Sequence, residues 1–161
     1  IMLIELVERA DHRTNSLVDS NQKPILNQFF NSITSLGSAY FTLILIGAFW
    51  SFGDFWIAQK LGTGLLLAGI VIFSLKYAAK RQRPENHIEN IFSRASFPSG
   101  HSGNSFMTAT ILSSALGSTA GFFSLAFTVA ASRVYLEDHY LSDVIAGSAI
   151  GFIIGQILIT V

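Results

Sequence analysis

Long apolar segments separated by short polar breaks make up most of the chain from residue 38 onward. Five segments consist mainly of apolar or small residues: 38–52, 55–75, 103–120, 121–136 and 141–161. A membrane-spanning helix needs about 17 to 25 such residues, so these segments lie near the lower end of that range. The pattern predicts an all-α polytopic membrane helix bundle with about five transmembrane helices.

Before residue 38 the apolar residues are spaced for one face of a helix. Leu3, Leu6, Val7 and Ala10 share a helical face, and Pro24 starts a second amphipathic stretch that ends near Gly37. The polar segment 11–22 between them is predicted as a loop. We therefore expect interfacial helices over 1–37, lying along the membrane surface. A helix pair of the soluble type, packed on its neighbours, is the alternative.

Small residues recur every four positions in two of the apolar segments. They are Gly147, Gly151 and Gly155 in the last segment, and Ala109, Ser113 and Gly117 in segment 103–120. Such spacing lets helix backbones approach closely. The glycines could serve dimerisation, but packing inside the bundle is the favoured interpretation.

Composition supports a membrane protein of one domain. The chain has 161 residues, of which 50% are hydrophobic and 12% are charged. Soluble domains carry about 25% charged residues. We expect a single domain over 1–161, with interfacial helices in 1–37 and the transmembrane bundle in 38–161. The formal net charge of zero gives no argument for a nucleic-acid partner, and the absence of cysteine excludes disulfides and thiolate chemistry.

Polar residues gather on one predicted side of the membrane. If the spans alternate, the loops 76–102 and 133–143 emerge together with the N-terminal helices. The opposite side then keeps only Asp54 and Lys60 of the charged residues. We therefore expect any functional site to lie in these two loops.

Three motifs lie in these loops. They are Lys76 to Arg83-Pro84, then Pro98-Ser99-Gly100-His101, then Ser132-Arg133 followed by His139 and Asp143. A helix that continued past Lys76 would place Arg83 on the same side, before Pro84 stops it. The i, i+4 spacing of His139 and Asp143 would let a carboxylate meet an imidazole on one helical turn. His101 falls where a helix could begin, and the free amides of a helix start attract anions.

The residue types suit phosphoryl transfer. Lys76, Arg83 and Arg133 can neutralise phosphate oxygens, and Ser99 and Gly100 can add a hydroxyl and backbone amides. Two histidines can divide the nucleophile and acid roles, with a carboxylate to fix one imidazole tautomer.

The motifs KxxxxxxRP, PSGH and SRxxxxxHxxxD, in this order, resemble the three-part signature of the type-2 phosphatidic acid phosphatase superfamily. That superfamily includes membrane lipid phosphate phosphatases and soluble vanadium haloperoxidases. The matching region extends from Lys76 to Asp143, about two fifths of the chain. Many membrane members resemble six-helix proteins, whereas this chain begins at the amphipathic segment, so a first span is either absent or replaced by the interfacial helix.

The resemblance implies a mechanism and a site. His139 would attack phosphorus and form a phosphohistidine, His101 would protonate the leaving group and then activate water, and Asp143 would orient His139. The phosphate would be bound by Lys76, Arg83, Ser99, Gly100 and Arg133. No metal and no cofactor are implied.

The implied substrate is a membrane lipid phosphate, and the implied partner is the bilayer. Phosphatidylglycerol phosphate, undecaprenyl diphosphate, phosphatidate and lipid A 1-phosphate all present a terminal phosphate on an apolar anchor. The resemblance implies a multi-pass protein of the bacterial inner membrane with its site facing the periplasm. Against this, nine of the ten Lys and Arg residues map to the active side, which the positive-inside rule would place in the cytoplasm.

Two other functions remain open at this point. A non-catalytic transporter or channel for an anionic lipid or ion would use buried charges along its path, but here the charges cluster at span ends. A soluble haloperoxidase would need a water-soluble fold, which the apolar segments disfavour.

Several polar residues outside the three motifs have simpler interpretations. His12 and His87 are expected at the surface, although His87 could line an entrance. Lys80, Arg81 and Arg94 could attract an anionic headgroup or form a solvated basic loop. Glu137 and Asp138 could ligate a metal, but they lack a recognised ligand spacing.

Overall fold

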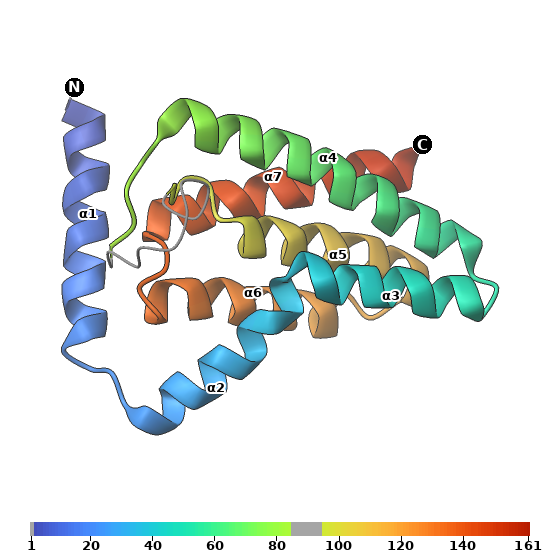
Figure 1. Cartoon of the computed structure of the whole chain (residues 1–161), viewed down its shortest axis with the longest axis horizontal. Coiled ribbons are helices and arrows are strands. Elements are labelled where there is room, and N and C mark those ends of the chain that lie inside the picture. The colour runs from blue at the N-terminus through green and yellow to red at the C-terminus, as the bar shows by residue number, and fades with distance from the viewer. Residues whose placement is uncertain (1, 85–94) are drawn as a thin grey trace.

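The computed structural model describes residues 2–84 and 95–161. Every regular element in these residues is helical: α1 (Met2–Asp19), α2 (Pro24–Thr34), the 3-10 turn η1 (Ser35–Gly37), α3 (Ala39–Ser51), α4 (Phe55–Ala79), α5 (Gly100–Leu116), α6 (Thr119–Tyr135) and α7 (Leu141–Thr160). Helices α3 to α7 run along the molecule, and α1 lies across one end (Figure 1). The predicted all-α fold is confirmed.

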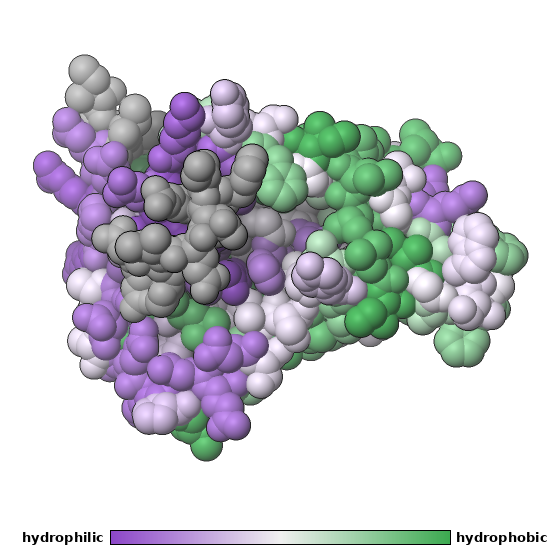
Figure 2. Space-filling model, viewed as in Figure 1, coloured by the Kyte–Doolittle hydropathy of each residue, from purple (hydrophilic) through white to green (hydrophobic). Residues whose placement is uncertain are grey.

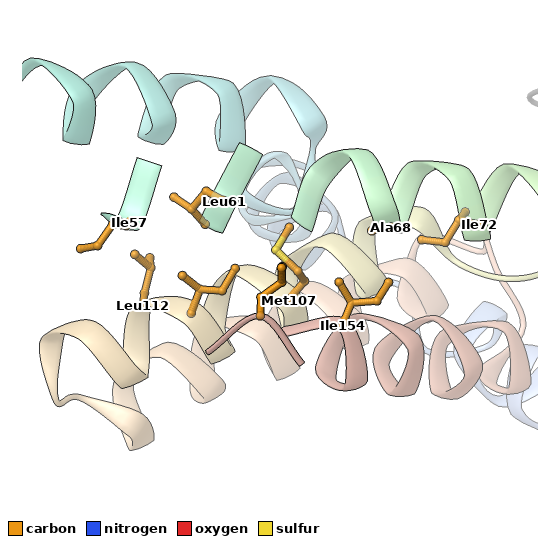
Figure 3. Close-up of a cluster of buried hydrophobic side chains, with 9 residues drawn as sticks. Ile57, Leu61, Ala68, Ile72, Met107, Leu112 and Ile154 are labelled. Atoms are coloured by element: carbon orange, nitrogen blue, oxygen red, sulfur yellow. The ribbon is translucent and has the colours of Figure 1, made fainter. Parts of the chain in front are cut away.

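Helix α5 forms the centre of the bundle. All of its residues from Ser102 to Leu112 are buried, because α4, α6 and α7 each pack against it. Apolar side chains from α4, α5 and α7 form the larger core cluster (Figure 3): Ile57, Leu61, Ala68, Ile72, Met107, Ile111, Leu112, Ile154 and Leu158. The many small and hydroxyl-bearing residues of α5 therefore belong to a helix that is buried among other helices.

The ends of α5 differ from the predicted segment 103–120. Ser99 caps the helix by accepting a hydrogen bond from the backbone amide of Ser102, so the helix begins at Gly100. It ends at Leu116 because Gly117 adopts a left-handed conformation, with φ of 74°. This start places His101 in the first helical turn.

Glycines on α7 allow it to pack directly against the backbone of α5. A Cβ added to Gly151 would overlap the carbonyl oxygen of Gly103, and one added to Gly147 would overlap that of Ser99. The third glycine, Gly155, lies against the side chain of Thr110. The favoured interpretation of these glycines, packing within the bundle, is confirmed. The stripe predicted in 103–120 does not form this contact: Ala109 packs in the cluster shared with α6, and Gly117 lies beyond the end of α5.

Two helices of the described chain, α4 with 25 residues and α7 with 20, are long and apolar enough to cross a membrane. The α2–η1 segment and α3 could form a third span, bent by 54°. The expected number of five spans is thus not confirmed: α3 alone has only 13 residues, and α5 and α6, with 17 each, are at the lower limit of length and are not among these candidates. Large apolar side chains point outward along the bundle, including Leu66, Ile70, Phe73, Ile153 and Ile157. Figure 2 shows hydrophilic residues gathered toward one end and hydrophobic residues toward the other.

The N-terminal region is more helical than predicted. Helix α1 continues to Asp19, through most of the segment expected to be a loop. Its polar side chains support the helix locally, since the Thr14 hydroxyl donates to the carbonyl of Ala10 and Ser16 donates to that of Arg13. The predicted stretch from Pro24 to Gly37 is confirmed as α2 and η1. That these helices lie along a membrane surface stays a prediction.

Candidate active site

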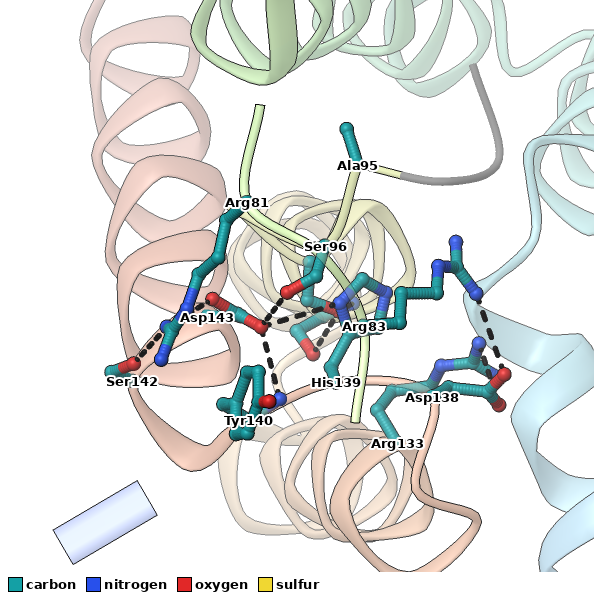
Figure 4. Close-up of polar contacts among 12 residues, drawn as sticks. Arg81, Arg83, Ala95, Ser96, Arg133, Asp138, His139, Tyr140, Ser142 and Asp143 are labelled. Carbon is teal, nitrogen blue, oxygen red and sulfur yellow. Dashed lines mark hydrogen bonds and ion pairs between the residues drawn. The ribbon is translucent and has the colours of Figure 1, made fainter. Parts of the chain in front are cut away.

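Four chain segments bring the predicted site residues to one end of the bundle (Figure 4). They are the end of α4 with the segment after it, the start of α5, the end of α6 with residues 136–140, and the start of α7. The positive charges of Lys76, Arg83 and Arg133 all act on both His101 and His139. Cations and imidazoles from distant parts of the chain therefore share one site.

Lys76 lies on helix α4, whereas Arg83 lies in the segment that follows this helix. Helix α4 ends at Ala79, and Lys80 takes a left-handed conformation with φ of 48°. The prediction that one helix carries both residues is therefore wrong. The Lys76 ammonium donates to the carbonyls of Ala95 at 2.6 Å and Ser96 at 3.3 Å, which ties α4 to the segment before α5.

Arg83 and Arg133 are held together by one carboxylate. Asp138 lies 3.4 Å from the Arg83 guanidinium and 2.9 Å from that of Arg133, which also donates to the Thr34 hydroxyl at 2.7 Å. Within the described residues, the buried Nε atoms of both arginines have no hydrogen-bond partner. Buried charged donors need an acceptor, so these two N–H groups suit an anion that enters the site.

His139 lies just outside helix α7. Its backbone amide donates to the carbonyl of Arg133 at 3.1 Å, and its side chain is only 2% exposed. The imidazole Nδ1 lies 3.8 Å from Oδ2 of Asp143, which is the third residue of α7. The two residues are paired as predicted, but they do not share a helical turn, and the distance is longer than a hydrogen bond.

The environment of His139 keeps its imidazole neutral. Burial lowers the pKa of His139 to about 4, against the opposing effect of Asp143, and the charges of Arg133, Lys76 and Arg83 lower it further. At neutral pH the ring is thus unprotonated on one nitrogen. With a proton on Nδ1, next to the carboxylate, the lone pair lies on Nε2 and is available to an electrophile.

The polar groups of Ser99, in the second motif, form hydrogen bonds within the protein. The Ser99 hydroxyl accepts from the Ser102 amide at 3.4 Å and from the Ser102 hydroxyl at 2.9 Å. Its own amide donates to the Asp143 carbonyl at 2.9 Å. Ser99 therefore fixes the start of α5 against α7, while Gly100 and His101 line an adjacent cavity.

A scan against protein-family models matches residues 57–161, about two thirds of the chain, to the PAP2 superfamily. The chain belongs to the PAP2 superfamily. The resemblance drawn from the three motifs is thereby confirmed, and the family match includes all of them.

Relatives of this PAP2 chain are named as lipid phosphatases. It is 33% identical to the lipid A 1-phosphatase of Porphyromonas gingivalis over 66% of this chain, and 30% identical to phosphatidylglycerophosphatase B of Bacillus subtilis over 92%. The aligned regions span 24% and 81% of those proteins. The crystal structure of Aquifex aeolicus LpxE superposes with a TM-score of 0.82 at 29% identity, covering 94% of this chain and 95% of that one.

A cavity of about 340 Å³ extends from the site of this PAP2 protein along α4. Lys76, Gly100 and His101 line its polar part, and residues of α4 as far as Leu65 line its apolar part. Lys76 and Leu65 are eleven residues apart, which corresponds to about 16 Å along a helix. The cavity therefore joins the cationic end of the bundle to its apolar middle.

Arg81 and Asp11 lie at the site, although the sequence predicted neither of them there. Arg81 forms ion pairs at 2.7 Å with Asp143 and with Asp11 of α1, so the expectation of a headgroup contact or a solvated loop is wrong for this arginine. Lys80 lies over the exposed ring of Tyr77. Arg94 and His87 lie outside the described residues.

The position of Asp11 had a signal in the sequence. Val7, Asp11 and Val18 are spaced so that they share one face of a helix, and this spacing could have placed Asp11 on the inner face of α1.

Proposed function

We propose that this chain is an integral membrane phosphatase that removes the terminal phosphate of a lipid phosphomonoester or diphosphate through a phosphohistidine intermediate. The observation that carries the proposal is a pair of buried arginine Nε atoms, without a hydrogen-bond partner among the described residues, near a buried neutral imidazole. A tetrahedral anion would satisfy the arginines and present its phosphorus to that imidazole.

The proposed reaction has two displacements. The lone pair on Nε2 of His139 attacks phosphorus, the bond to the lipid oxygen breaks, and His101 gives that oxygen a proton. Burial and the nearby cations lower the pKa of His101, so it holds this proton only when the negative charge of the bound phosphate opposes them. A water molecule then attacks the phosphohistidine while His101 takes its proton, which releases phosphate and restores His139. Asp143 stabilises the positive imidazole during attack, and Lys76, Arg83, Arg133 and the first amides of α5 hold the phosphate oxygens.

The cavity along α4 supports a lipid as the carrier of the phosphate. A phosphate near Lys76 and His101 would place an attached chain against Ala68, Ile72 and Leu65. The named activities of the relatives also concern phosphates attached to lipids. Phosphatidylglycerol phosphate, lipid A 1-phosphate, phosphatidate and undecaprenyl diphosphate remain the proposed candidates.

We place the protein in the bacterial inner membrane as one domain, with its site on the periplasmic side. The many cations near the site bind phosphate, so they are weak indicators of a cytoplasmic face. Single cysteines introduced at Asp54 and at Glu8 in whole cells would test the orientation, because the chain has no cysteine of its own. A membrane-impermeant maleimide should label the cysteine at Glu8 and spare the one at Asp54.

The function is tested by phosphate release from purified protein in detergent micelles. We expect metal-independent turnover, unaffected by a chelator, on at least one of the candidate lipids. Binding of the lipid without release of phosphate would instead indicate a carrier or channel.

Vanadate should inhibit this turnover. Vanadate adopts the five-coordinate geometry of phosphorus under attack, so it should occupy the site in competition with the lipid phosphate. The measurement is the initial rate at several substrate and vanadate concentrations. Insensitivity to vanadate at millimolar concentration would contradict an in-line attack by His139.

Filling the cavity should raise KM for lipids with long chains. Gly69 lines the cavity, and a Cβ added there meets no atom within 4 Å, so Gly69→Leu would place its side chain in open space. We expect KM for a long-chain substrate to rise about 10-fold, since roughly 1 to 2 kcal/mol of apolar contact is lost. KM for a short-chain analogue should change little. Gly47→Leu on α3 is the control, because Gly47 is exposed and also has no neighbour within 4 Å.

A further inference from the structure

Asp11 of α1 is a buried carboxylate whose partners all belong to the active-site end of the bundle. The residue is only 2% exposed. Its Oδ2 accepts from the Arg81 guanidinium at 2.7 Å and from the Ser142 hydroxyl at 2.5 Å, and its Oδ1 accepts from the Ser142 backbone amide at 3.0 Å. Asp11 thereby connects α1 to the first turn of α7, which also carries Asp143.

Arg81 joins Asp11 to Asp143. One terminal nitrogen of its guanidinium donates to Asp143 Oδ1 and to the Ser142 hydroxyl, both at 2.7 Å, and the other donates to Asp11. The guanidinium also lies 4.2 Å from the centre of the Tyr140 ring. Figure 4 shows Arg81 between Ser142 and Asp143, on the side of the carboxylate away from His139. Arg81 is therefore committed to protein partners, whereas the Nε atoms of Arg83 and Arg133 have no hydrogen-bond partner in 2–84 and 95–161.

The contact with Arg81 helps to fix how Asp143 faces His139. With Oδ1 bound to Arg81, the other oxygen, Oδ2, accepts from the Ser96 hydroxyl and from the Tyr140 amide and lies 3.8 Å from the imidazole of His139. Without Arg81 only the two contacts at Oδ2 would restrain the carboxylate, and Oδ1 would lose its partner. Asp143 and Asp11, both buried, would then also lack the cation that they share.

We propose that Asp11 and Arg81 are positioning residues for the reaction: Asp11 holds Arg81, and Arg81 holds Asp143 in the orientation that serves the nucleophile His139. This inference rests on the proposed phosphatase function. It makes α1, which precedes the family-matched region 57–161, part of the catalytic apparatus.

The test compares kcat and KM of Arg81→Gln and Asp11→Asn with the wild type on micellar phosphatidylglycerol phosphate, or on whichever candidate lipid the wild type turns over. Loss of a hydrogen bond between charged groups corresponds to about 10- to 100-fold in rate, so we expect such a fall in kcat for Arg81→Gln. KM should stay within about threefold, because Arg81 does not reach the phosphate. Asp11→Asn, which is nearly isosteric, should lower kcat less. Glu8→Gln removes an exposed carboxylate from the same helix and should leave both constants unchanged.

A double variant separates a shared role from independent structural ones. If Asp11 acts through Arg81, Asp11→Asn in the Arg81→Gln background should be no slower than Arg81→Gln alone, because it removes a carboxylate that has lost its cation. Multiplied losses would overturn the proposal. So would a raised KM with unchanged kcat, or a normal kcat for the folded fraction of either variant.

Folding is monitored by size-exclusion chromatography and thermal unfolding in detergent. If Arg81→Gln does not fold, Arg81→Lys takes its place, since it keeps the charge but cannot bridge both carboxylates, and it should also lower kcat with KM preserved. Inhibition by inorganic phosphate should match the wild type in every variant. An inactive wild type would refute the proposed function instead, whereas an active wild type with fully active Arg81 and Asp11 variants would refute only this inference.

Discussion

Replacing His139 with alanine is expected to abolish phosphate release while the protein remains folded. The buried imidazole is the proposed nucleophile, and removal of a catalytic nucleophile costs at least about 10⁴-fold in kcat. The remaining cations can bind the substrate but cannot form the covalent intermediate. The measurement is phosphate release from micellar lipid, with unfolding temperature in detergent as the check on folding.

A trapping experiment makes this expectation specific to the nucleophile. Rapid quenching of the wild type in alkali during turnover of ³²P-labelled substrate should yield a base-stable, acid-labile phosphoprotein, as expected for phosphohistidine. His139→Ala should yield none. Glu8→Gln on α1, at an exposed site, should keep wild-type turnover and labelling. Retained activity in His139→Ala would remove His139 from the nucleophile role.

Gly151→Ala is expected to give the largest loss of stability among small substitutions in the bundle. The added Cβ would overlap the carbonyl oxygen of Gly103, which belongs to the backbone of α5 and cannot turn aside. Overpacking of this kind costs about 1 to 3 kcal/mol or more, which corresponds to a fall of about 2 to 12 °C in the unfolding temperature. The helices would have to separate, so activity at the junction of α5 and α7 should fall as well.

Gly47→Ala on α3 is the matched control for this substitution. A Cβ at Gly47 meets no atom within 4 Å, so only the intrinsic helix preference of alanine changes. Its unfolding temperature in detergent should equal or slightly exceed that of the wild type. Equal stability of Gly151→Ala and Gly47→Ala would show that the close contact between α5 and α7 does not exist in the protein.

Helix positions were predictable where long apolar runs or an amphipathic stretch marked them. The segments assigned to 38–52 and 55–75 correspond to α3 and α4, and Pro24 marks the first residue of α2. The boundaries shifted where local hydrogen bonds decide them, as at Ser99, which caps α5. Helix α1 was underestimated because Asp11 and the residues after it are polar, and a buried polar partner cannot be read from polarity alone.

The motifs named most of the residues that meet at this end of the bundle, but not the parts played by Arg81 and Asp11, and not the contacts. The spacing of Lys76 and Arg83 suggested a common helix, whereas the left-handed Lys80 ends α4 before Arg83. That two arginines share Asp138, and that Arg81 bridges α1 to α7, are consequences of tertiary packing. Spacing along the chain carries no information about such long-range pairs.

The backbone contact between Gly103 and Gly151 has a consequence for an enzyme that works in a fluid bilayer. His101 precedes Gly103 by two residues, and Asp143, the partner of His139, precedes Gly151 by eight. Main chain touching main chain leaves no compressible side chain between the two helices. If a thicker or thinner membrane tilts one of them, the other must follow, so we expect the separation of the proposed proton donor, His101, and the proposed nucleophile, His139, to be insensitive to lipid composition.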